Sequence, residues 1–158
     1  MKAKMYSFMV MAFAVLLISS CNKSNDDASL IFSVHRTGGW VGLDENIKIN
    51  AGATSYSIRY HDLFTHESKS YQTTIKTPDE LWAYLIKSFD LDTFTNIKDG
   101  PCRACLDGYD ETISVIINGK TYSFYNGVID GPYQEMQDFF DIIFKQIEDF
   151  EIIAKFRE

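Results

Sequence analysis

Two cysteines separated by two residues, Cys102 and Cys105, form the motif in this sequence whose spacing best suits sulfur chemistry. Such a pair closes a small disulfide, exchanges thiols with other proteins, or supplies half of a zinc site. Thiol exchange needs the first cysteine at the start of a helix that directly follows a strand, because the helix dipole lowers the thiol pKa. Here the pair follows Gly100-Pro101 in a predicted loop and leads towards a predicted strand. The context favours a structural disulfide, with a thiol-disulfide protein as the alternative.

A zinc site would need further ligands, and the sequence offers no second pair with ligand spacing. The candidates are three histidines and two nearby acids: His35, His61, His66, Asp107 and Asp110. His61 and His66 are one residue too far apart for the i, i+4 arrangement of a helix. We therefore expect exposed histidines on strands or turns, and no metal or other cofactor.

Catalytic motifs do not stand out. The sequence contains no nucleophile elbow, phosphate-binding glycine loop or metalloprotease motif. Its 22 acidic side chains suit a solvated surface, and no pair of them is distinguished by its neighbours. We predict that the protein is not an enzyme.

A glycine-rich turn around a tryptophan is the remaining candidate site, with the sequence Arg36-Thr37-Gly38-Gly39-Trp40-Val41-Gly42. Because glycine tolerates positive φ, this turn can either bury or present the indole. One interpretation folds Trp40 back onto the core. The other exposes Trp40 as a contact anchor, since tryptophan is common among interface hot spots. The second interpretation gives the predicted partner-binding residues Arg36, Gly38, Gly39, Trp40 and Gly42.

Four segments of alternating apolar and polar residues predict the strands that must carry these candidates. They cover residues 29–36, 47–49, 56–60 and 68–75. The tryptophan turn would then connect the first strand to the second.

Two helices are also expected. Thr77-Pro78-Asp79-Glu80 is typical of a helix start, in which Thr77 caps the free amides and Glu80 completes a capping box. Apolar residues at helical spacing follow it. Pro132 opens a final helix with the same periodicity.

A hairpin is predicted between Glu111 and Tyr125, where Asn118-Gly119 joins two apolar runs and favours a type I′ turn. That turn sets the predicted pairs: Ile117 with Lys120, Val115 with Tyr122, and Ile113 with Phe124. The order of strands, helix, hairpin and helix predicts an α+β fold. Two helices would pack on one face of a largely antiparallel sheet.

The first 20 residues resemble the signal peptide of a bacterial lipoprotein. Lys2 and Lys4 precede an apolar run from Met5 to Ile18, which is shorter than the about 20 residues of a membrane-spanning helix. The run ends in Leu17-Ile18-Ser19-Ser20-Cys21, which is similar to a lipobox. The resemblance implies cleavage before Cys21 and attachment of lipid, including palmitate, to that cysteine.

The resemblance also implies a bacterial cell-envelope location, and export to an oxidising compartment favours the disulfide. Residues 21–28 would form a flexible tether and residues 29–158 a single domain. Asp26-Asp27 is similar to an export tag of surface lipoproteins in the Bacteroidetes group, with a solvated linker as the alternative. We expect an outer-membrane anchor, periplasmic or surface-exposed. Removing Lys2 and Lys4 leaves 13 Lys and Arg against 22 Asp and Glu, a net charge of −9. This charge repels phosphate backbones, so we expect no nucleic-acid partner.

The tryptophan turn resembles a segment of the emfourin family, small proteins that inhibit thermolysin-like metalloproteases. The shared pattern is Arg-x-Gly-Gly-aromatic-x-Gly after a first strand, followed by a helix, a strand pair and a closing helix. Its matches here are Arg36, Gly38, Gly39, Trp40 and Gly42. The resemblance implies a non-catalytic, inhibitor-like domain that binds a protease or another envelope protein. The alternatives are an envelope thiol-disulfide protein and an accessory component of an envelope assembly.

Overall fold

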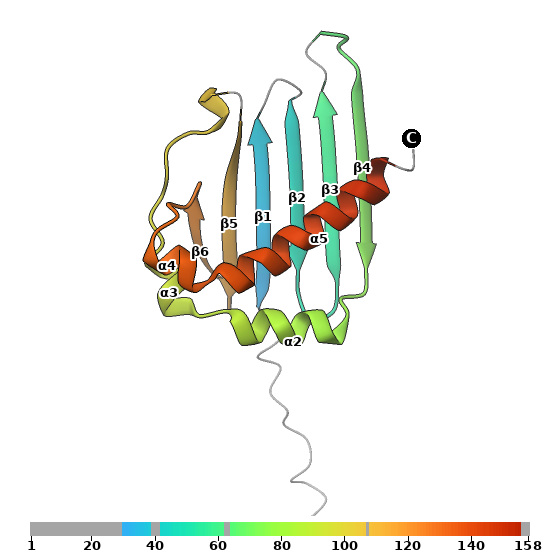
Figure 1. The fold of residues 1–158 in the computed structure, drawn as a ribbon. Coiled ribbons are helices and arrows are strands. Elements are labelled where there is room, and N and C mark those ends of the chain that lie inside the picture. Colours follow the sequence, from blue (N-terminus) through green and yellow to red (C-terminus); the bar gives the residue numbers. More distant parts are fainter. Residues whose placement is uncertain (1–29, 39–41, 62–63, 107, 156–158) are drawn as a thin grey trace, which may run out of the picture.

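The structure is a computed structural model that describes residues 30–38, 42–61, 64–106 and 108–155. Its strands form one antiparallel sheet of six, in the order β4-β3-β2-β1-β5-β6 (Figure 1). They are β1 (Ile31–Gly38), β2 (Leu43–Ile49), β3 (Thr54–His61), β4 (Ser68–Ile75), β5 (Tyr109–Ile117) and β6 (Lys120–Tyr125). The helices are α2 (Asp79–Ser88), α3 (Leu91–Thr95), α4 (Gly131–Glu135), α5 (Gln137–Lys155) and the 3-10 turn η2 (Ala104–Leu106). The predicted α+β class is confirmed.

The helices cover one face of the sheet. Side chains alternate between the two faces of a strand, so every second residue of β1, β2, β3 and β5 faces the helices, and most of these residues are apolar and buried. α5 crosses this face diagonally, from β6 to β4, and α2 lies across the end of the sheet where β1 begins (Figure 1). The central packing is aromatic, with the Phe32 ring contacting Trp82, Phe89 and Phe139. No helix within the described ranges is long and apolar enough to cross a membrane.

The hairpin prediction is confirmed pair by pair. Ile117 pairs with Lys120, Val115 with Tyr122, and Ile113 with Phe124. Asn118 and Gly119 have φ values of 51° and 77°, the left-handed conformation that a type I′ turn requires. Turn chemistry and the hydrophobic pattern agreed here, which is why the register was predictable.

The helix starts differ from the prediction. Thr77 does not cap α2, because its hydroxyl lies 2.9 Å from the hydroxyl of Thr54 and both residues are fully buried. Pro78 occupies the N-cap position without a side-chain cap. The final helix is divided at Met136 into α4 and α5, and the short helix α3 was not predicted. Tertiary contacts with the sheet outweighed the local capping signal.

The two ends of the sheet have different roles. The chain enters β1 at Ile31, at the end of the sheet beside α2 (Figure 1). The opposite end, here called the loop end, is where β1 finishes and where β2 begins, β3 finishes, and β4 and β5 begin. The tryptophan turn, the β3–β4 connection and η2 therefore belong to one end of the molecule.

Candidate functional site

The glycines on either side of the tryptophan turn pack against neighbouring connections. Gly38 has a φ of 115°, and a Cβ at this position would lie 2.7 Å from the Cβ of Ala104 in η2. Gly42 has a φ of 52°, and a Cβ there would lie 2.9 Å from the carbonyl oxygen of His61 at the end of β3. Both positions require glycine for conformation and for space. The other predicted turn residues, Gly39 and Trp40, lie outside the described residues.

The two connections beside this turn expose large apolar side chains. Leu106 at the end of η2 is 83% exposed, and Phe64 in the β3–β4 connection is 81% exposed. These are the most exposed large apolar side chains in the part of the chain that the structure describes. Exposed apolar side chains at one end of a sheet can contribute to protein binding, because burying them on association is favourable. The loop end therefore has a chemical character suited to a protein partner.

Arg36 lies beneath the turn and points into the protein. Its side chain is only 11% exposed. Its Nε donates a hydrogen bond to Oε2 of Glu111 at 2.8 Å, and a terminal nitrogen lies 3.4 Å from Oε2 of Glu45. The guanidinium is also held between two rings, 5.0 Å from the centre of Tyr109 and 5.1 Å from that of Phe144. These contacts hold the end of β1 in place, so Arg36 supports the turn from inside the fold.

Glu45 completes a buried network that we call the arginine cluster, made of Arg36, Glu45, Tyr56 and Glu111. The Tyr56 hydroxyl donates a 2.6 Å hydrogen bond to Oε1 of Glu45. Burial raises the pKa of Glu45 above its ordinary value, although the Tyr56 hydrogen bond and the charge of Arg36 oppose that rise. Burial, with the neighbouring Glu45 carboxylate, raises the pKa of Tyr56. The cluster therefore places charged groups inside the core, where each depends on its partners.

Sequence reasoning missed this cluster, yet strand alternation contained the signal. Phe32 and Val34 face the helices, so Arg36 continues their series. Glu45 precedes Ile47 and Ile49 on the buried side of β2, which begins at Leu43 and is longer than predicted. If the alternation of each strand had been continued by one more inward-facing position, the sequence would have predicted one arginine and two carboxylates on the helix side of the sheet.

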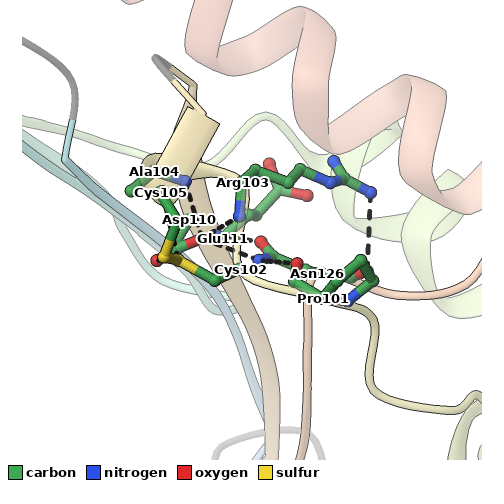
Figure 2. The surroundings of a disulfide bond; sticks show 8 residues. All are labelled: Pro101, Cys102, Arg103, Ala104, Cys105, Asp110, Glu111 and Asn126. Atoms are coloured by element: carbon green, nitrogen blue, oxygen red, sulfur yellow. Dashed lines mark hydrogen bonds between the residues drawn. A yellow bond between two sulfur atoms is a disulfide. The ribbon is translucent and has the colours of Figure 1, made fainter.

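The predicted sulfur pair forms a disulfide: Sγ of Cys102 and Sγ of Cys105 lie 2.04 Å apart (Figure 2). Asp110 holds the loop that carries it. Oδ1 of Asp110 accepts hydrogen bonds from the backbone nitrogens of Arg103 at 2.7 Å and Ala104 at 3.1 Å. Hydrogen bonds, led by those from the side chains of Tyr125 and Asn126, lower the pKa of Asp110 well below its usual range. Asp110 is therefore ionised at neutral pH.

Asn126 connects this loop to the sheet. Its Nδ2 donates to Oδ1 of Asp110 and to the carbonyl of Pro101, both at 2.8 Å, and its Oδ1 accepts a 2.7 Å hydrogen bond from the nitrogen of Glu111 (Figure 2). The residue is buried and has a φ of 48°. We call this second network the disulfide loop, defined by Cys102, Cys105, Asp110 and Asn126.

The charge of Asp110 bears on sulfur chemistry. Its Oδ2 lies 3.6 Å from Sγ of Cys102, which carries no proton in the disulfide. On reduction, a thiolate on Cys102 would face this carboxylate, and like charges at such a distance disfavour ionisation of the thiol. Thiol exchange requires the thiolate. The surroundings of the pair therefore suit a structural bond that fixes η2 beside Gly38.

The histidines occupy strand and turn positions without a ligand cluster. His35 Nε2 lies 3.0 Å from Oδ1 of Asp44, and His61 Nδ1 lies 2.8 Å from Oγ of Ser68. His35 and His66 are exposed, and His61 is half-buried. Within the described ranges, no group of three or more histidine, cysteine or acidic residues is arranged to hold a metal ion.

An open hollow of about 530 Å³ lies between α2 and α5, away from the loop end. Its lining mixes one aromatic and one aliphatic residue with charged and hydroxyl groups: Tyr84, Lys87, Ser88, Asp138, Asp141 and Ile142. The Ser88 hydroxyl donates to the backbone oxygen of Tyr84 at 2.8 Å, so it is engaged within its own helix. None of the residues that line the hollow is a histidine or a cysteine, which are common catalytic bases and nucleophiles.

Comparisons with known proteins do not identify the chain. No family model matches the sequence, and no curated protein matches it significantly. The predicted lipidation site, Cys21, lies outside the described residues. The site is therefore defined by the geometry around Gly38 and Gly42, with η2 and the end of β3 packed against these glycines and the arginine cluster below them.

Proposed function

We propose that this protein is a lipid-anchored, non-catalytic binding protein of the bacterial cell envelope, and that its loop end binds a protein partner as a protease inhibitor does. One observation carries the proposal. The two most exposed large apolar side chains among the described residues, Leu106 and Phe64, lie in η2, which packs against Gly38 through Ala104, and in the connection that follows His61, the residue that packs against Gly42. An apolar surface on either side of a glycine-tryptophan turn suits a protein more than a small polar ligand.

The position of this surface supports the same proposal. The chain enters β1 at Ile31, and the strand reaches the turn at Gly38. With a rise of about 3.4 Å per residue, the turn lies on the order of 25 Å from the point where a tether would join the domain. A lipid on Cys21 would hold the entry end near the membrane. The loop end would then project away from the membrane, where a partner has access.

The lipid anchor has its own test. Cells that produce the full chain are labelled with radioactive palmitate, and the wild type is compared with Cys21→Ser. Label on the wild type and none on the variant is the expected result, since a lipobox cysteine is the acceptor. An unlabelled wild type recovered in the cell interior would contradict the envelope location.

Partner binding is tested with the chain from residue 21 onward carrying Cys21→Ser, which contains every described element. The probe is a thermolysin-like metalloprotease assayed with a peptide substrate. We expect inhibition, and we expect Trp40→Ala, Leu106→Ala and Phe64→Ala each to weaken it by about tenfold or more, the loss typical of a hot-spot side chain. Tyr84→Ala is the matched control, because Tyr84 is 62% exposed on α2, away from the loop end.

Two further outcomes test separately which class of partner is bound and which surface binds it. Protease activity that is unchanged by the wild-type protein would remove the inhibitor-like form of the proposal. The same variants are then used as bait in envelope extracts analysed by mass spectrometry. Equal capture by wild type, Leu106→Ala and Phe64→Ala would contradict the loop end as the binding surface.

A further inference from the structure

The outer edge of β4 is open for strand pairing. β3 pairs with all of β4 from Ser68 to Ile75, and no strand in the described ranges pairs with the other side. The residues of β4 are exposed or half-exposed, and the strand contains no proline and no acidic residue. An edge strand presents a row of backbone N–H and C=O groups that another strand can satisfy.

At the opposite edge of the sheet, the chain itself covers the end of β6. The backbone nitrogen of Tyr125 in β6 donates a 2.7 Å hydrogen bond to Oδ1 of Asp99. The Tyr125 carbonyl accepts a 2.8 Å hydrogen bond from the nitrogen of Gly100. β6 is also the shorter edge strand, from Lys120 to Tyr125. Segment 99–100 therefore blocks strand pairing at the end of β6, whereas β4 is the longer of the two edge strands.

We propose that β4 pairs antiparallel with β4 of a second copy of this chain, about a two-fold axis at Gln72. Such an axis, perpendicular to the sheet, keeps the helices of both copies on the same face. It also places residues of equal parity opposite each other, as an antiparallel ladder requires. The two six-stranded sheets become one continuous sheet.

The side chains of β4 complement one another in this register. On the helix side, Lys69 lies opposite Ile75 and Tyr71 lies opposite Thr73 of the other copy. On the outer side, Ser70 lies opposite Thr74, and Gln72 lies opposite itself. An aromatic residue opposite a β-branched one, and one hydroxyl residue opposite another, are favourable cross-strand pairs. In this register no residue lies opposite a residue of like charge.

Ile75 distinguishes this register from the neighbouring one centred on Tyr71. Ile75 is 44% exposed, although it points to the helix side of the sheet. In the register at Gln72, the aliphatic stem of Lys69 from the second copy covers it. In the register at Tyr71, Ile75 lies opposite Glu67, which precedes the strand. The favourable pairs Tyr71–Thr73 and Ser70–Thr74, with no opposed like charges, favour a second copy over an unrelated peptide.

The test is sedimentation velocity over a rising concentration series of the chain from residue 21 onward with Cys21→Ser. Strand pairing alone makes a small interface, so we expect monomer at low concentration and dimer at high concentration. Two double variants probe the register: Ser70→Lys with Thr74→Lys, and Ser70→Glu with Thr74→Glu. Both positions are solvent-exposed, and circular dichroism checks that each variant is folded.

In each variant alone, like charges lie opposite at about 5 Å and dimerisation should be lost. An equimolar mixture pairs Lys with Glu and should restore the dimer. The control is Thr121→Lys with Ser123→Lys on β6, at the other edge of the sheet, which should dimerise like the wild type. A wild type that stays monomeric throughout, double variants that dimerise normally, or a mixture that fails to restore dimerisation would each overturn the proposal.

Discussion

The arginine cluster and the disulfide loop contain adjacent acidic residues of β5, and the two carboxylates have different kinds of partner. Glu111 points to the helix side and binds Arg36, whereas Asp110 points to the other side and binds backbone nitrogens. Asn126 contacts both, since its side chain binds Asp110 and the nitrogen of Glu111. The two networks therefore hold the same end of the sheet from its two faces.

The two networks differ in what happens to the remaining groups when one member is removed. In the arginine cluster, charged side chains neutralise one another in the core, so removing one leaves a buried charge without its partner. In the disulfide loop, an ionised carboxylate satisfies the nitrogens of an irregular segment near solvent, and a covalent bond closes the same segment. The first network should thus determine global stability, and the second should determine the local order of η2.

The largest effect should follow Arg36→Ala. Glu111 and Glu45 would stay buried without their common cation, which costs about 3–5 kcal/mol in the free energy of unfolding. Urea denaturation followed by circular dichroism measures this loss. Arg59→Ala, at an exposed position of β3, is the matched control and should change stability by less than about 0.5 kcal/mol. Equal losses for the two variants would mean that the cluster adds nothing to stability.

A smaller loss should follow Asn126→Ala, because three hydrogen-bonding groups of the loop and β5 would lose their partner. We expect about 2–3 kcal/mol, measured in the same way. Asn118→Ala shares the left-handed backbone, with a φ of 51° against 48° for Asn126, but lies exposed in the hairpin turn. Asn118→Ala should therefore cost less than Asn126→Ala, and equal losses would mean that the buried hydrogen bonds of Asn126 add no more stability than an exposed left-handed asparagine does.

The smallest effect is a dependence on pH, with opposite signs in the two networks. The folded pKa of Asp110 is lowered, so its contribution to stability is present above the unfolded value of about 4 and is lost as pH falls below it. Thermal unfolding of wild type and Asp110→Asn should converge between neutral pH and about pH 2.5. A constant difference over that range would contradict this assignment.

Glu45 provides the contrasting measurement. Its folded pKa is raised, so folding disfavours its ionised form and the wild type should gain stability relative to Glu45→Gln as pH falls from neutral towards about 4. Asp110→Asn and Glu45→Gln should therefore change the pH profile in opposite directions. Profiles that change in the same direction would remove the distinction between the two networks.

Local patterns predicted the regular parts of this fold well. The hairpin register followed from Asn118-Gly119 and the alternation around it, because turn type and side-chain parity both act within a few residues. The disulfide between Cys102 and Cys105 was also predictable, because the two cysteines are separated by two residues and lie in a loop rather than at the start of a helix after a strand. In contrast, the prediction that Thr77 caps a helix was wrong. The competing partner of its hydroxyl, Thr54, lies in a strand more than 20 residues earlier, where a local pattern cannot reveal it.

The candidate site was predictable only in outline. The glycines of the tryptophan turn indicated a special backbone, but their neighbours, Ala104 and His61, come from distant segments that strand order brings together. Strand order also places Leu106 and Phe64 at the same end of the sheet, and sequence periodicity does not specify that order. Arg36 looked like a surface contact because it precedes a glycine-rich turn, whereas its strand parity points it inward.

The central position of β1 has a mechanical consequence. This strand carries the chain's entry point at one end and the tryptophan turn at the other, and it is paired along its length with β2 on one side and β5 on the other. A force applied before Ile31 therefore acts parallel to the strand and loads both ladders in shear. The hydrogen bonds of both ladders must then break together rather than one after another, so the domain should resist a pull at this end of the chain.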